Sequence, residues 1–107
     1  MNDLTTKTCT ACEGGTPPLD QTKIASLLTE VTNWQTDNTK IFKTFNFKDF
    51  KTAIVFVNKI VALAEKENHH PDLCVHDYNQ VTVTLSTHNI NGLSLNDFIM
   101  ASKIDEL

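Results

Sequence analysis

The chain has 107 residues, a length typical of one compact domain. Its formal net charge is −4, and all nine of its positively charged residues are lysines. Arginine supplies the bidentate hydrogen bonds with which proteins grip phosphate and guanine, so its absence argues against direct nucleic-acid binding. Apolar residues make up 40% of the chain, enough for a small core, and a domain this short can depend on an oligomer interface.

The sequence lacks the usual signals of export and membrane insertion. No apolar run reaches the roughly 18 residues of a membrane span. Residues 1–15 are polar and lack the apolar centre of a signal peptide. The three cysteines, an odd number, do not make a disulfide framework. We therefore expect a cytoplasmic protein with no membrane partner.

The chain is predicted to consist of a flexible lead-in, residues 1–18, and a single domain, residues 19–107. Residues 12–18 hold two of the three glycines and two of the three prolines, which are typical of turns and loops. A first helix is predicted from the N-cap Asp20 to Asn33. Residues 34–47 then indicate two short strands.

A second helix is predicted to end at about Glu67. Its apolar stripe follows helical spacing. The stripe consists of Phe50, Ala53, Ile54, Val57, Ile60, Val61 and Ala64, widened by Phe56 and Leu63. Pro71 disfavours helical geometry at the preceding residue, so His69 and His70 are predicted to lie at the helix end or in the following turn.

Two more strands and a last helix complete the predicted order. Residues 72–76 and 79–88 indicate the strands, and in the second of these apolar and polar residues alternate as in a sheet with one buried face. The last helix is predicted to begin at Ser94, with Asp97 completing a capping box. The fold class is therefore α+β, in the order α-β-β-α-β-β-α, with a four-stranded antiparallel sheet and three helices packed on one face.

A metal site is one reading of the histidines. The potential ligands are His69, His70, Cys74, His76 and His88. Their spacing is poor, because zinc sites favour paired ligands two to four residues apart at each end. Cys9 and Cys12 form a better half-site, but no second cysteine pair exists. We therefore expect no metal.

General acid–base chemistry is a second reading, since histidine titrates near neutral pH. Glu65 lies one helical turn before His69, and Asp97 stands in the first helical turn after His88. A carboxylate beside an imidazole fixes its tautomer and favours its charged form. Structural explanations remain open: histidine at a helix C-terminus is favourable to the helix dipole, Glu65 suits an exposed helix face, and a capping box accounts for Asp97.

Seven residues in order over 33 positions form a more specific pattern. They are Glu65, His69, His70, Pro71, Tyr78, His88 and Asp97. The segments IFKTFNFKDF and ASKID flank them. From about Pro18 onward, the sequence resembles the pterin-4a-carbinolamine dehydratase family.

The resemblance implies an α+β fold, usually in a homodimer or homotetramer. It also implies an activity, the dehydration of 4a-hydroxytetrahydropterin to quinonoid dihydropterin and water, with no metal or organic cofactor. This reaction recycles the pterin used by an aromatic amino acid hydroxylase, which would be a functional partner. The alternative functions are a non-catalytic dimerisation or coactivator module and a histidine metal site.

The resemblance further implies site residues. His69, His70 and His88 are expected to be catalytic, with Glu65 and Asp97 orienting or tuning them. Which imidazole is the acid and which the base stays open. The residues expected to contact the pterin are Asn68, His69, His70, Ser86, Thr87, His88 and Asn89.

The sequence departs from the family pattern at three positions. Asn68 stands where vertebrate-like members tend to carry an acid, and Leu73 where an aromatic residue often follows. His76 has no clear family role, so we interpret it as an exposed strand residue.

Overall fold

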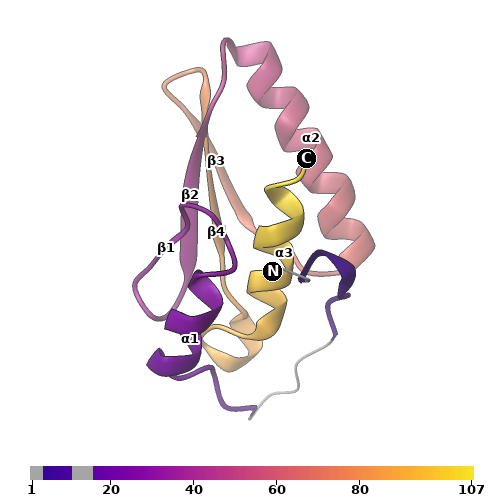
Figure 1. The fold of residues 1–107 in the computed structure, drawn as a ribbon. Coiled ribbons are helices and arrows are strands. Elements are labelled where there is room, and N and C mark those ends of the chain that lie inside the picture. Colours follow the sequence, from indigo (N-terminus) through magenta and orange to yellow (C-terminus); the bar gives the residue numbers. More distant parts are fainter. Residues whose placement is uncertain (1–3, 11–15) are drawn as a thin grey trace.

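One antiparallel sheet runs along one side of the molecule, on the left in Figure 1. The computed structural model describes residues 4–10 and 16–107. The strands are β1 Gln35–Thr36, β2 Ile41–Asn46, β3 Asp72–His76 and β4 Gln80–Leu85, arranged in the order β1-β2-β4-β3. Both predicted strand pairs are therefore present, and β4 lies at the centre of the sheet beside β2.

Strand β4 supplies the centre of the buried face. Its side chains Val81, Val83 and Leu85 are fully buried, whereas Thr82 and Thr84 between them are half-buried on the opposite face. Alternation of this kind places every second side chain in the core. The predicted sheet with one buried face is thus confirmed.

Three helices cover this buried face (Figure 1). They are α1 Gln21–Leu28, α2 Phe50–Glu67 and α3 Leu95–Ile104, so the predicted order α-β-β-α-β-β-α is confirmed. Asp20 caps α1 by accepting a hydrogen bond from the Lys23 N–H, and Asp49 caps α2 in the same way. Helix α1 ends earlier than the predicted end at Asn33, which has a positive φ of 65°.

The predicted stripe of α2 was wrong at its edges. Phe50 and Val61 are 54% and 48% exposed, while Phe56, assigned to the margin, is buried. The buried α2 residues are Ala53, Phe56, Ile60, Ala64 and Glu67. The helix therefore buries a narrower strip than its apolar residues suggested. The last residue of that strip is the carboxylate Glu67.

Helix α3 lies between α1 and α2 and is the most deeply buried helix of the described fold (Figure 1). Ser94 and Asp97 form the predicted capping box, in which each side chain accepts a hydrogen bond from the other residue's backbone N–H. Asn96 and Asp97 are buried together with the apolar side chains of the helix. The start of α3 thus brings polar groups into the interior.

Residues 4–10 contact the domain, which the sequence pattern did not indicate. They begin with the 3-10 helix η1, Leu4–Thr6, and Leu4 is a buried member of the core. Figure 1 shows this segment beside α3 and the C-terminal end of α2. The predicted boundary near residue 18 remains a prediction, and Cys12 lies outside the described residues.

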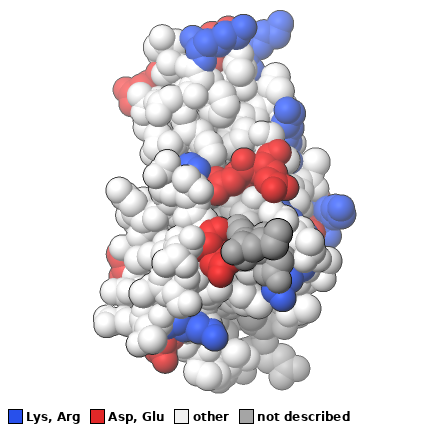
Figure 2. Space-filling model, in the orientation of Figure 1, with Lys and Arg blue, Asp and Glu red and all other residues white. Residues whose placement is uncertain are grey.

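Charged side chains are mixed on the surface. On the face drawn in Figure 2, acidic and uncharged side chains separate the lysines. No helix in the described ranges, 4–10 and 16–107, combines the length and the apolar character that crossing a membrane requires.

Candidate active site

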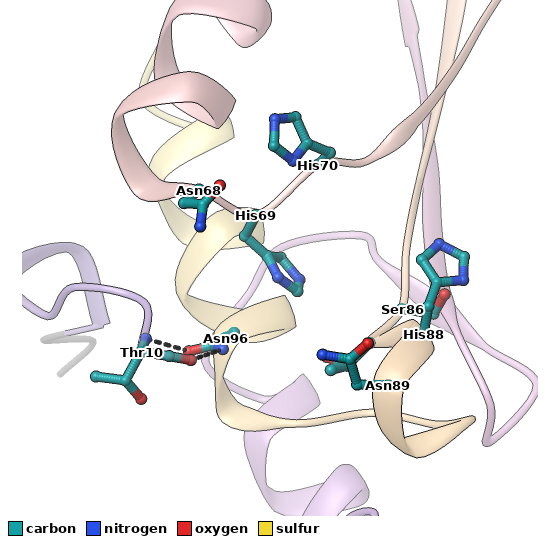
Figure 3. Close-up of a pocket in the computed structure, with 9 residues that line it drawn as sticks. Thr10, Asn68, His69, His70, Ser86, His88, Asn89 and Asn96 are labelled. Carbon is teal, nitrogen blue, oxygen red and sulfur yellow. Dashed lines mark hydrogen bonds between the residues drawn. The ribbon is translucent and has the colours of Figure 1, made fainter. Parts of the chain in front are cut away.

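A cavity of about 280 Å³ lies where the end of α2, the end of β4 and the start of α3 meet (Figure 3). It is lined by Thr10, Asn68, His69, His70, Ser86, Thr87, His88, Asn89 and Asn96. All seven residues expected to contact substrate are among them. The structure therefore brings together histidines that are up to 19 positions apart in the sequence.

The end of α2 turns the twin histidines in different directions. Asn68 adopts the left-handed conformation, with φ of 53° and ψ of 41°, which asparagine tolerates better than most residues. Pro71 then follows His70 and prevents the helix from resuming. In Figure 3 the His69 ring points into the cavity, towards the side of α3 and Asn89, whereas the His70 ring points away from them.

His69 is held by a buried carboxylate. Its Nε2–H donates to Asp97 Oδ1 over 2.7 Å, and the Asp97 side chain is 0% exposed against 12% for His69. Asp97 Oδ2 accepts from the Thr87 hydroxyl and from the Ser94 N–H. A proton held on Nε2 leaves the lone pair of a neutral His69 on Nδ1. Asp97 therefore sets both the position and the tautomer of this imidazole.

His70 has a different carboxylate partner. Its Nε2–H donates to Glu65 Oε2 over 2.6 Å, and both side chains are more than half exposed. In the sequence Glu65 lies one helical turn before His69 and Asp97 follows His88, but the hydrogen bonds join Glu65 to His70 and Asp97 to His69. Because Asn68 breaks the helical spacing, Glu65 reaches His70, and Asp97 reaches His69 across the gap between α3 and α2.

The third histidine follows β4. His88 begins the 3-10 helix η2, His88–Ile90, and is exposed, as is Asn89. Thr87 just before them is buried, and its hydroxyl also forms a hydrogen bond with the Ser94 hydroxyl. The sequence predicted that Thr87 contacts the pterin, and in the structure its hydroxyl donates a hydrogen bond to Asp97.

His76 lies on a different part of the sheet from these residues. Its two ring nitrogens form hydrogen bonds with Asp77 Oδ2 and Thr82 Oγ1. It is half-buried rather than exposed as interpreted from the sequence, and it is not among the residues that line the cavity. Within residues 4–10 and 16–107, no three His, Cys, Asp or Glu side chains group in a way that could hold a metal ion.

Nothing in the sequence pattern indicated that Thr10 and Asn96 would line the cavity. The Asn96 side-chain amide accepts from the Thr10 N–H through Oδ1 over 3.0 Å and donates to the Thr10 carbonyl through Nδ2. This pairing places the N-terminal segment at the wall of the cavity (Figure 3).

Comparison with known proteins agrees with this architecture. Residues 17–107 match the family model described as pterin 4 alpha carbinolamine dehydratase. The chain belongs to the pterin-4a-carbinolamine dehydratase family. The predicted family membership is therefore confirmed.

Relatives within the pterin-4a-carbinolamine dehydratase family match over nearly their whole length. A protein of Nitrosospira multiformis named "Putative pterin-4-alpha-carbinolamine dehydratase" is 44% identical, over 100% of this chain and 94% of its own. A protein of the same name from Methylococcus capsulatus is 45% identical, over 97% of this chain and 92% of its own.

Two solved structures of pterin dehydratase type are similar. The crystal structure of a transcriptional coactivator/pterin dehydratase from Brucella melitensis has a TM-score of 0.77 at 36% identity, covering 83% of this chain and 96% of that one. A pterin dehydratase-like protein identified as a RuBisCO assembly factor in the alpha-carboxysome has a TM-score of 0.56 at 22% identity, covering 68% and 83%. The second likeness shows the fold alone.

This pterin-4a-carbinolamine dehydratase family member also has a buried carboxylate just outside the cavity. Glu67 accepts from Lys103 Nζ over 2.8 Å and from the Cys9 N–H over 2.9 Å. The Lys103 hydrogen bond, followed by that from Cys9, lowers the pKa of the Glu67 carboxyl below its ordinary 4.5. Burial, and then the negative charge of Glu67, raises the pKa of the Cys9 thiol to about 12. Cys9 therefore stays protonated at neutral pH and is not a thiolate nucleophile.

The lowered pKa of Glu67 predicts how stability depends on pH. Its folded-state pKa is below its unfolded value, so the stabilisation is complete above about pH 4.5 and is lost as pH falls through the folded pKa. Urea unfolding of wild type and Glu67→Gln from neutral to acidic pH should therefore show a difference in unfolding free energy that shrinks in acid. A difference independent of pH would contradict this prediction. Glu106→Gln, at an exposed carboxyl, is the control.

Proposed function

We propose that the protein dehydrates 4a-hydroxytetrahydropterin to quinonoid dihydropterin and water by histidine acid–base catalysis. The observation that carries the proposal is His69, fixed by the fully buried Asp97 at a cavity that His70 and His88 also line. Family membership supports the same reaction. A buried carboxylate that fixes one imidazole tautomer is typical of catalytic histidines.

The reaction requires two proton transfers. One proton leaves the ring nitrogen next to the hydroxyl-bearing carbon, and another joins the hydroxyl group as it departs as water. The electron pair of the broken N–H bond forms the new carbon–nitrogen double bond. A neutral imidazole can accept the first proton and an imidazolium can supply the second, and each positioned group contributes about 10²–10⁴-fold. Three histidines line the one cavity and are the groups that we assign to these two roles.

The cavity also carries groups suited to a pterin ring. Asn68, Ser86 and Asn89 line it together with the histidines. Asparagine amides both donate and accept, as does a serine hydroxyl. The amide and amino edge of a pterin needs donors and acceptors of this kind. We assign these three residues to substrate binding, with Thr87 supporting Asp97.

Other parts of the proposal follow from the family resemblance. They are a homodimer or homotetramer, a cytoplasmic location, and a functional link to an aromatic amino acid hydroxylase whose pterin is recycled. On α2, Phe50 and Val61 are exposed apolar side chains that an oligomer interface would cover.

A direct assay tests the proposed activity. Purified, chelator-treated protein should accelerate the disappearance of 4a-hydroxytetrahydropterin, followed by absorbance, by at least about 100-fold over the uncatalysed rate. Chelator treatment should leave this rate unchanged, because the proposed chemistry uses imidazoles alone. A wild-type rate at the uncatalysed background would refute the enzyme proposal.

A binding module without catalysis is the second candidate. The similar Brucella melitensis structure is described as a transcriptional coactivator/pterin dehydratase, which favours this alternative. A binding role does not need an imidazole fixed by a buried carboxylate. Background activity together with a stable complex between this chain and a protein partner would support the module instead.

A further inference from the structure

The end of α2 is joined to α3 by two successive polar contacts. The second contact is the His69 to Asp97 hydrogen bond of the site. The first lies two residues earlier in α2, where the Glu67 carboxylate pairs with Lys103 of α3. The backbone between them passes through Asn68 in its left-handed conformation. Movement of Glu67 relative to α3 would therefore be transmitted directly to His69.

Both oxygens of Glu67 are used in fixing this position. Its side chain is 3% exposed; Oε2 accepts from Lys103 and Oε1 accepts from the Cys9 N–H. A buried carboxylate is costly unless its hydrogen bonds are satisfied, so it tolerates little displacement. Glu67 thus fastens α2, α3 and the N-terminal segment at one point.

The N-terminal segment reinforces the same arrangement. Leu4 anchors it in the core, and Thr10 at its other end pairs through its backbone with the Asn96 side chain, directly before Asp97. Residues 4–10 therefore bind Glu67, a partner in the first contact, and Asn96, the residue directly before Asp97 of the second contact. Thr10 and Asn96 also form part of the cavity wall.

We propose that Glu67 and Lys103 are positioning residues for the active site, and that residues 4–10 complete this support by binding both Glu67 and Asn96. The support keeps His69 within hydrogen-bonding reach of Asp97 and aimed into the cavity. Its catalytic consequence rests on the dehydratase function proposed above. Small displacements of a reacting group are costly in rate, which is why a contact outside the cavity matters.

The chain offers a matched pair of variants. Lys103 and Lys43 are each 16% exposed, and each forms an ion pair with a carboxylate, at 2.8 and 2.7 Å. Lys43 of β2 pairs with Asp105, which follows the last turn of α3, and neither residue lines the cavity. Lys103→Met thus removes the ion pair between α3 and α2, whereas Lys43→Met removes the one between α3 and β2, together with a hydrogen bond to the Thr32 carbonyl.

The expected results differ between the two variants. Lys103→Met should lower kcat/KM by about tenfold, mainly through kcat, while Lys43→Met keeps it within about twofold. Lys103→Arg, which retains the pairing with Glu67, should recover most of the activity. Thermal unfolding of each variant checks that all are folded at the assay temperature, and Glu67→Gln provides an isosteric second test of the same contact.

A proton NMR measurement tests the positioning without an activity assay. The His69 Nε2 proton, hydrogen-bonded to the buried Asp97, should give a slowly exchanging downfield resonance. It should be lost or broadened in Lys103→Met and Glu67→Gln, and retained in Lys43→Met.

The outcomes separate the two proposals. Retention of the resonance together with wild-type kinetics in both Lys103→Met and Glu67→Gln overturns the positioning role. An inactive wild-type protein refutes the dehydratase function alone, and the resonance then decides the positioning role by itself. A loss of activity in Lys43→Met equal to that in Lys103→Met would show a general stability effect and would also overturn the proposal.

Discussion

Replacing Asp97 with asparagine should lower kcat/KM by about 10²–10⁴-fold, the largest effect we expect from any single substitution. Both carboxylate oxygens of Asp97 accept hydrogen bonds, Oδ1 from His69 and Oδ2 from Thr87 and Ser94. An amide has only one acceptor oxygen. The Ser94 N–H is always a donor and retains that oxygen, so the new NH₂ group faces His69 Nε2. The imidazole must then move its proton to Nδ1 and lose its proton-accepting site towards the substrate.

Steady-state kinetics and thermal unfolding test this prediction together. Asp105→Asn is the control, because Asp105 is a partly buried acceptor at the other end of α3, bonded to Trp34 and Lys43. It should lower stability but leave kcat/KM within about twofold. Equal kinetic losses in Asp97→Asn and Asp105→Asn would show that Asp97 acts only as a helix cap.

The single substitutions His69→Ala and His88→Ala should each lower kcat/KM by more than about tenfold, with the fold intact. His69→Ala removes the imidazole that Asp97 fixes. His88→Ala removes an exposed imidazole that follows β4 and lines the cavity. The two removals should affect proton transfer rather than packing. Circular dichroism and thermal unfolding will show whether the fold is retained.

His76→Ala is the control for the histidine series. His76 is hydrogen-bonded to Asp77 and Thr82 and does not line the cavity, so its loss should leave kcat/KM within about twofold of wild type. Unchanged kinetics in both His69→Ala and His88→Ala would remove these residues from the mechanism.

Local patterns in the sequence predicted the elements of the fold well. The alternation of Val81, Val83 and Leu85 identified β4 and its buried face, and the Ser94 and Asp97 spacing identified the start of α3. Each signal depends only on neighbouring residues and on one buried face. The α2 stripe failed at Phe50 and Val61 because periodicity shows which residues share a helix face, but not how much of that face its neighbours cover.

Pairings between distant residues could not be predicted in this way. The ordered family motif pointed to His69, His88 and Asp97 as candidate site residues, but it did not show that Asp97 bonds to His69 rather than to His88, which is nearer in sequence. The actual pair is 28 residues apart and depends on how α3 packs beside α2. The contacts of residues 4–10 were missed for a similar reason, since a single leucine in a polar segment is a weak signal.

Under the proposed function, Asp97 links the timing of folding to the appearance of activity. The same carboxylate completes the cap of α3 and fixes His69, so the catalytic arrangement cannot exist before α3 has docked against α2. A partly folded chain with its sheet and α2 in place would still lack a competent site. If the protein is the proposed dehydratase, recovery of turnover during refolding should therefore follow the docking of α3 against α2.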